Sequence, residues 1–180
     1  MRVLDLGGVA ASWESLPVRP TQVVLLNERV FDVPPGGGFL SITGDACVPD
    51  DKLRREGFDL VYSNSCFEHV GGHYRREQFA ETVHALAPRH WVQTPNRYFP
   101  LEPHWLFPYL QFLPTRAKVQ LSKAWPGRYH MPNESRRERT RWALSVELLS
   151  RSEFAYYFPD SEIATERIAG LSKSFVAIKA

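Results

Sequence analysis

Residues 3–8, VLDLGG, decide how this sequence folds. A short apolar run ends there in an acidic residue and two glycines, an order typical of the first strand and turn of a nucleotide-binding βα unit. Glycines at such a turn allow a ligand to approach the backbone closely. The stretch is not a GxGxxG motif, so it does not indicate a dinucleotide, and an ordinary tight turn explains it equally well. Its meaning therefore depends on the pattern of the remaining chain.

Four further short runs have the composition of buried strands. Each is rich in β-branched or aromatic residues and is bounded by Gly, Pro, Asn or Asp, and they span residues 22–26, 39–43, 58–63 and 90–94. A helix is expected over residues 73–87, where apolar side chains recur at helical spacing. This alternation predicts right-handed crossovers and an α/β fold with a doubly wound, mostly parallel Rossmann-like sheet.

Residues 101–142 interrupt the alternation and are expected to form an inserted helical lid over an acceptor. Eight Lys or Arg and two acids lie between Thr115 and Arg141, and the basic run 136–141 is expected to be a solvated helix face. Aromatic residues are interleaved with the charges. They can stack on sugar or base rings, a role we expect for Trp125 and Tyr129, or pack as helical core contacts, as for Trp105, Phe107 and Phe112.

The last part of the chain returns to regular structure. Ser145 is placed to cap a helix over residues 146–157. Residues 161–170 and 173–180 then have the pattern of two closing strands in an antiparallel hairpin. At the other end, residues 11–16 supply only a turn or two of helix for the first crossover. That thin crossover leaves apolar surface uncovered and favours a homodimer.

The bulk properties are those of one ordinary globular domain spanning residues 1–180. Of the 180 residues, 43% are hydrophobic and 23% are charged, and a formal net charge of +2 does not by itself imply nucleic acid. Cys47 and Cys66 form no CxxC pair, which argues against a zinc knuckle or a disulfide framework. The chain opens without a signal-peptide layout and has no apolar run of about 20 residues, so a cytoplasmic protein without a membrane span is expected.

Two strand ends carry further candidates for ligand binding. Asn27 ends the second strand, where a ribose-binding acid is found in nucleotide-binding sheets, although a turn-forming Asn is an equally good explanation. Asp45 follows the third strand within Gly44-Asp45-Ala46 and could accept a hydrogen bond from an adenine amino group.

The complete ordered set resembles the class I S-adenosylmethionine-dependent methyltransferases. It comprises VLDLGG (3–8), Asn27, GDA (44–46), FDLVYSNSCFEHV (58–70), TPNRYFPLEPH (94–104) and ERIAGLSKSFVA (166–177). The resemblance implies S-adenosylmethionine as cofactor and a binding set that begins at Asp5. In that set Gly7 and Gly8 lie beside the methionine moiety, Asn27 near the ribose, Asp45 and Ala46 at the adenine, and Asn64 near the methionine end. Val9 and Ala11 stand where the family often has glycine, and Asn27 stands in place of its usual acid.

Candidate bases gather after the fourth and fifth strands, where such a fold places its site, and they are Glu68, His69, His73, Glu102 and His104. Glu68, His69 and His104 would also make a face for a divalent ion such as Mg²⁺. This arrangement resembles metal-assisted O-methyltransferases with an ExxEH motif, although Ser65 stands here in place of the first acid. Alternatively, Glu68 caps or pairs and His69 is a satisfied interior histidine. His130 could touch an acceptor, whereas no chemistry is expected at His84 and His90.

These features predict O-methylation of a hydroxyl on a polar small-molecule acceptor, with a sugar or oligosaccharide as the leading expectation. One alternative is ribose 2'-O-methylation of RNA, which the basic insert favours and the low net charge disfavours. A second is an inactive cofactor-binding partner of another enzyme, which the imperfect glycine motif favours and the His/Glu cluster disfavours.

Overall fold

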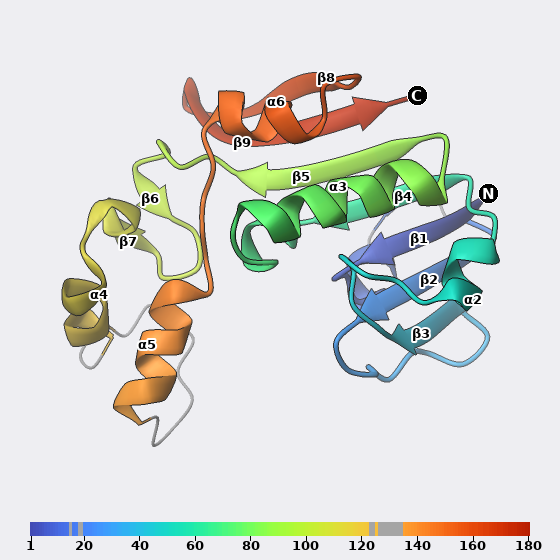
Figure 1. Ribbon diagram of the computed structural model, residues 1–180, viewed down its shortest axis with the longest axis horizontal. Coiled ribbons are helices and arrows are strands. Elements are labelled where there is room, and N and C mark those ends of the chain that lie inside the picture. Colours follow the sequence, from blue (N-terminus) through green and yellow to red (C-terminus); the bar gives the residue numbers. More distant parts are fainter. Residues whose placement is uncertain (15, 18–19, 123–124, 126–134) are drawn as a thin grey trace.

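The computed structural model describes residues 1–14, 16–17, 20–122, 125 and 135–180 (Figure 1). Seven strands form one sheet in the order β3-β2-β1-β4-β5-β9-β8. Their bounds are β1 (Arg2–Leu6), β2 (Gln22–Asn27), β3 (Phe39–Thr43), β4 (Leu60–Asn64), β5 (His90–Pro95), β8 (Glu162–Ile168) and β9 (Leu171–Lys179). The first five are parallel, and β9 runs antiparallel to both β5 and β8. The expected doubly wound α/β sheet with a C-terminal hairpin is confirmed.

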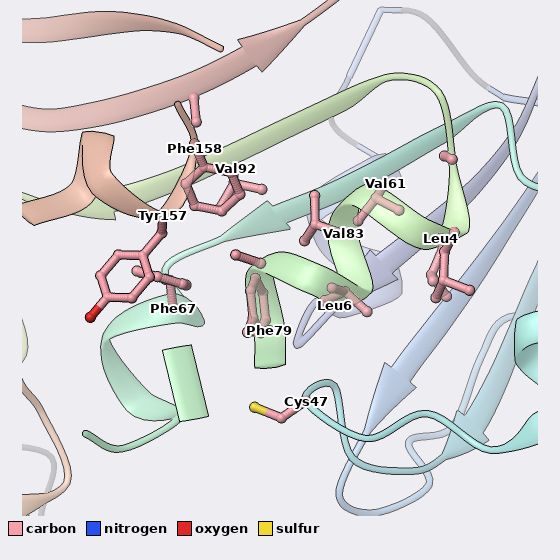
Figure 2. Packing of buried hydrophobic residues seen from close by; sticks show 14 of the residues in the cluster. Leu4, Leu6, Cys47, Val61, Phe67, Phe79, Val83, Val92, Tyr157 and Phe158 are labelled. Atoms are coloured by element: carbon pink, nitrogen blue, oxygen red, sulfur yellow. The ribbon is translucent and has the colours of Figure 1, made fainter. Parts of the chain in front are cut away.

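One face of the sheet carries the main hydrophobic core. The helices α2 (Asp51–Arg55), α3 (His73–Leu86) and α6 (Arg151–Tyr157) lie on the near side of the sheet in Figure 1. Alternate strand residues point toward this layer because successive side chains of a strand face opposite ways. Figure 2 shows the cluster, in which the sheet supplies Leu4, Leu6, Val61 and Val92, and the covering segments supply Phe67, Phe79, Val83 and Phe158.

The opposite face has a much smaller covered area. The helix α1 (Ala10–Glu14) buries Trp13 against Val3, Val23 and Leu25 of β1 and β2. Trp13 also packs on Tyr62, and the Tyr62 ring stacks on Trp91 of β5, with centroids 4.7 Å apart and planes 9° apart. A row of three aromatic rings therefore runs across this face from β1 toward β5.

The prediction of a helix over residues 146–157 is wrong about the residue at which the helix begins. Ser145 is the C-cap of α5 (Arg136–Leu144) and does not begin a helix. Ser150 is the N-cap of α6. The hydroxyl of Ser150 accepts from Glu153 N–H, and the Glu153 carboxylate accepts from Ser150 N–H, which makes a capping box. That reciprocal pair satisfies two backbone donors and sets the start of α6.

The insert lies beyond the carboxyl ends of the parallel strands and is drawn in yellow to orange in Figure 1. It contains β6 (Leu101–Glu102), β7 (Phe107–Pro108), the 3-10 turn η2 (Leu110–Phe112), α4 (Thr115–Leu121) and α5. Trp105 is a buried core residue, as expected, but it lies in the β6–β7 turn. Phe107 lies in β7 and the exposed Phe112 in η2, so the expectation of an α-helix around these three residues is wrong. The Trp125 indole donates to Trp105 O at 2.7 Å. Tyr129 and His130 lie outside the described residues. None of the described helices has the length and apolarity to cross a membrane.

Candidate active site

The turn after β1 packs so tightly against neighbouring residues that two of its positions require glycine. Gly7 has φ +85°, and a Cβ there would lie 2.7 Å from the Sγ of Cys66. A Cβ on Gly8 would lie 1.8 Å from Oδ2 of Asp5. Side chains at these positions would run into Cys66 and the buried Asp5, so only glycine allows the turn to pack on both residues.

Asp5 lies under this turn, fully buried, and does not line the cleft above it. Its Oδ2 accepts from the Trp13 indole N–H at 2.7 Å, while its buried Oδ1 has no hydrogen-bond partner among the described residues. Burial raises the pKa of Asp5 to about 7, against a smaller lowering by the Trp13 hydrogen bond. Asp5 thus supports the glycine turn from below.

A cleft of about 230 Å³ opens above the turn, at the carboxyl ends of β1, β2 and β3. Four of the residues expected to bind cofactor line it, namely Gly7, Asn27, Asp45 and Ala46. The Asn27 amide donates to Gly8 O at 2.9 Å and so connects the ends of β1 and β2. The cleft also contains Glu28, which was not predicted from the sequence, although it directly follows the strand end at which an acid was sought.

Arg75 is a second cleft residue that was not predicted from the sequence. From the first turn of α3 its guanidinium donates to both carboxylate oxygens of Asp45, each at 2.8 Å. Asp45 Oδ1 also accepts from Cys47 N–H at 2.8 Å. The Arg75 hydrogen bonds lower the pKa of Asp45 and keep it ionised. The carboxylate is therefore held in one orientation at the β3 end of the cleft.

Three of the predicted catalytic residues lie together at the end of the cleft opposite Asp45. The 3-10 turn η1 (Phe67–His69) carries Glu68 and His69, and His104 comes from the β6–β7 turn. The two Nε2 atoms of His69 and His104 are 3.0 Å apart, and His104 Nε2 is 3.8 Å from Glu68 Oε1. Because His69 also lines the cleft, this cluster borders the space beside the glycine turn.

Hydrogen bonds fix the orientation of each member of the cluster. His104 Nδ1 lies 2.7 Å from Glu102 Oε1, and the other oxygen of Glu102 accepts from Trp105 N–H at 2.8 Å. Glu68 Oε2 accepts from the Thr94 hydroxyl at 3.0 Å, whereas its buried Oε1 has no hydrogen-bond partner in the described part of the chain. Because His104 Nδ1 faces the Glu102 carboxylate, it carries the proton of the neutral imidazole, and Nε2 then carries the lone pair that faces the cluster.

The surroundings of the two histidines shift their pKa values in opposite directions. Desolvation by the surrounding atoms, with the positive charge of His104, lowers the pKa of His69 to about 4. Burial also acts to lower the pKa of His104, but the hydrogen bond and charge of Glu102, with the charge of Glu68, raise it overall. Burial raises the pKa of Glu68 to about 6. At neutral pH the cluster therefore contains a neutral imidazole at His69 and a mainly ionised carboxylate at Glu68.

The donor set of this cluster fits a divalent ion. One ligand atom from each of Glu68, His69 and His104 lies within 4.8 Å of the others, the only such group of three among the described residues. Two nitrogens 3.0 Å apart have the spacing of neighbouring ligands on an octahedral ion whose bonds are about 2.1 Å long. The buried Oε1 of Glu68, which accepts no hydrogen bond from any described residue, supplies a negative oxygen. The carboxylate of Glu102 behind His104 is the usual outer partner of a metal-binding imidazole.

Other candidates lie elsewhere. His73 Nδ1 is 2.8 Å from the Tyr157 hydroxyl, and its Nε2 is 3.2 Å from Glu77, so this histidine belongs to the α3–α6 surface and not to the cluster. Asn64 lines a separate cavity on the α1 face of the sheet. His84 and His90 pack against Phe158 at the opposite end of α3, away from the cleft.

No protein-family model matches this sequence, and no curated protein matches it by sequence similarity. Solved structures do match. The N-terminal domain of EvdMO1, crystallised in the presence of S-adenosylhomocysteine (SAH) and D-fucose, has a TM-score of 0.53 and 14% identity, over 98% of this chain and 74% of its own. The methyltransferase domain of bacterial CtHen1-CN has a TM-score of 0.54 and 13% identity, over 98% of this chain and 88% of its own.

The chain has the class I methyltransferase fold. A third match with this fold is the 1,6-didemethyltoxoflavin-N1-methyltransferase of Burkholderia thailandensis, crystallised with 1,6-didemethyltoxoflavin and SAH. Its TM-score is 0.54 with 15% identity, over 99% of this chain and 70% of its own. At these identities the likeness concerns the fold, and what the site does must be argued from its residues.

Proposed function

We propose that this protein is an S-adenosylmethionine-dependent O-methyltransferase that acts on a hydroxyl of a polar acceptor, with sugars and oligosaccharides as the first class to test. The observation that carries the proposal is the position of the Glu68–His69–His104 cluster at the border of the glycine-turn cleft. A cofactor cleft next to groups that can assist a hydroxyl is what O-methyl transfer requires.

The cofactor cleft has a polar group for each part of the expected ligand. S-adenosylmethionine supplies a methyl group on a positively charged sulfur, which makes it ready for displacement. Gly7 lines the cleft, and its backbone would lie beside the methionine end. Asn27 and Glu28 offer acceptors to the ribose hydroxyls, and Asp45 offers one to the adenine amino group.

The cluster assists the acceptor in one of two ways. A bound Mg²⁺ would lower the pKa of a ligated hydroxyl, with Glu68, His69 and His104 as its holders. Without an ion, His104 Nε2 takes the hydroxyl proton, while its Nδ1 proton remains shared with Glu102. The neutral His69 then orients the acceptor oxygen. Insert residues 101–142 act as the lid that excludes water.

The test is cofactor binding followed by a transfer assay. Calorimetry with SAH and methyl transfer from labelled S-adenosylmethionine to a panel containing D-fucose, other sugars, phenols and short single-stranded RNA would define acceptor and atom. SAH binding with transfer to a hydroxyl is the expected result. SAH binding without any transfer supports the inactive-partner alternative, and failure to bind SAH at millimolar concentration contradicts both.

Ribose methylation of RNA is the second candidate, because α5 presents exposed Arg136, Arg137 and Arg141 and the fold also matches the small RNA methyltransferase HEN1 (TM-score 0.51, 16% identity, over 98% of this chain and 22% of its own). Phosphate contacts by these arginines would make RNA binding fall steeply with salt. A weak or salt-independent interaction with single-stranded RNA would leave the small-molecule acceptor as the better proposal.

A further inference from the structure

A second cavity, of about 580 Å³, lies on the α1 face of the sheet and shares no lining residue with the cofactor cleft. Its sheet side is formed by Trp91, Gln93 and Pro95, alternate residues of β5, and its outer side by residues of the β6–β7 segment. This volume is in the range of small-molecule sites, which combine mostly apolar walls with a few converging polar groups.

Gln93 supplies an unused donor in this cavity. Its side chain is only 5% exposed, and its Oε1 accepts from the Ser65 hydroxyl at 2.8 Å. Among the described residues its amide nitrogen has no hydrogen-bond partner, and that nitrogen is not among the atoms sealed from solvent. A buried amide N–H that opens only into a cavity needs an acceptor from water or from a ligand.

The walls favour a flat ring. The Trp91 indole is held by stacking on Tyr62, so its orientation is fixed before any ligand arrives. Leu101, Pro103 and Leu106 lie across the cavity and add apolar surface from the insert. The lining also contains polar side chains, namely Asn64, Ser65, Glu166, Lys173 and Ser174. An aromatic ring would place its faces against Trp91 and the apolar insert residues, and an acceptor at its edge would meet the donors of Gln93 and Lys173.

The backbone on both sides of the cavity is strained. Ser65 has φ 58° and Leu106 has φ 50°, although neither is glycine. Such residues cost free energy and are concentrated at ligand sites, where the surrounding structure holds them in place. The two strained positions therefore point to the same cavity as the unused donor.

The cavity and the catalytic cluster share their walls. Leu101 and Pro103 line the cavity, while Glu102 and His104, which alternate with them, face the cluster. At the turn after β4, Ser65 lines the cavity and Cys66 lines the cofactor cleft. A molecule in this cavity therefore lies next to both the cofactor cleft and the β6–β7 turn that holds His104.

We infer that this cavity binds a planar, mainly apolar ring that carries an oxygen acceptor at its edge, and that this ring is the anchoring part of the methyl acceptor. Binding of the ring is a property of the cavity alone, whereas its role as part of the acceptor rests on the proposed function. The corresponding acceptor class is a hydroxylated aromatic compound or the aromatic aglycone of a glycoside.

The experiment measures ring binding separately from catalysis. Benzoate, 4-hydroxybenzoate and 2-naphthoate are titrated into the whole protein by saturation-transfer NMR, with cyclohexanecarboxylate as a non-planar control. The planar compounds should bind and the control should not. Leu106→Trp, which fills the cavity, should raise Kd on the order of tenfold, whereas Leu40→Trp, on the distant edge strand β3, should not change it.

The variant Gln93→Met keeps the side-chain length and removes the donor, so it should weaken the planar acids more than it weakens naphthalene. Circular dichroism establishes that each variant is folded. Absence of planar-ring binding, or equal Kd for wild type and Leu106→Trp, overturns the inference. SAH binding by the wild-type protein is measured in parallel, so failure of the proposed function and failure of the ring site are separate results.

Discussion

The Cα of Gly8 lies so close to the carboxylate of Asp5 that no side chain can be placed between them. The acid at the end of β1 is buried beneath the turn, and the turn folds over it. This contact joins β1 to the cofactor cleft above it. It also explains the order of residues in VLDLGG, because the residue three positions after the buried acid must be glycine.

Replacement of Gly8 by Ala is expected to displace this turn. The new Cβ would lie 1.8 Å from Asp5 Oδ2, so either the carboxylate or the backbone must move. Loss of SAH binding and a lower Tm should result, measured by calorimetry and thermal unfolding. Gly57→Ala is the matched control, since a Cβ there meets nothing within 4 Å. Wild-type binding by Gly8→Ala would show that the turn is not closely packed.

Asp5 is expected to make stability depend on pH. Its pKa is raised from 3.8 to about 7, so the folded state retains a proton that the unfolded chain releases, and stability falls as pH rises from about 4 to 7. Asp5→Asn keeps an acceptor for Trp13 and removes the charge. The variant should exceed wild type in Tm at pH 8 by about 3 °C or more, and match it near pH 4. Equal Tm values at both pH values would contradict the buried charge.

Arg75 is expected to position Asp45 for the cofactor. Arg75→Ala should raise the Kd for SAH about tenfold and leave kcat at saturating cofactor nearly unchanged, because the pair lies at the β3 end of the cleft, away from the cluster. Arg75→Lys should recover only part of the affinity, since an ammonium cannot make two parallel hydrogen bonds. Arg89→Ala, whose guanidinium bonds Asp59 O, serves as control. An effect on kcat alone would place Arg75 in the chemistry instead.

The two catalytic routes respond differently to chelation. If an ion acts, EDTA should abolish transfer and Mg²⁺ or Mn²⁺ should restore it, and Mn²⁺ binding followed by electron paramagnetic resonance should be lost in Glu68→Gln. Under either route His104→Ala should lower kcat about 10²-fold with little change in SAH affinity. His73→Ala, which removes a histidine paired with Tyr157, should retain activity. Near wild-type kcat in both His69→Ala and His104→Ala would move the centre elsewhere.

The predicted homodimer is tested by mass. The five-residue α1 covers only part of the α1 face, and we expect a second copy to associate there. Light scattering at tens of micromolar should give twice the 20.7 kDa of one chain. A measured mass equal to that of one chain would contradict the predicted homodimer without affecting the proposed chemistry.

Strand ends could be predicted from the sequence because local patterns set them. The run 39–43 coincides with β3, and the rule that parallel strands end at one edge placed His69 and His104, 35 residues apart, at one site. The start of α6 was misjudged, although a signal existed. Ser150 is followed three residues later by Glu153, the capping-box pattern, whereas Ser145 is followed by Leu148.

The remaining differences arise from contacts that no local pattern reports. Arg75 reaches Asp45 across 30 residues, and nothing near either position indicates the pair. Asn64 lines the second cavity together with Ser65, whereas Cys66, the next residue of the turn, packs on Gly7 at the cofactor cleft. The strand pattern does not show to which of these two spaces each residue of the turn belongs.

The end of α5 is connected to the Glu68–His69–His104 cluster by two contacts. The backbone of Ser145 bonds the His69 side chain, and Glu147 N–H donates to Glu68 O at 3.0 Å. One short segment thus joins the insert to two members of the cluster. An acceptor whose binding moved α5 would also move these two contacts and so change the affinity of the cluster for an ion, and by thermodynamic reciprocity the ion would change the affinity for that acceptor by the same factor. Acceptor and ion would then behave as allosteric effectors of each other.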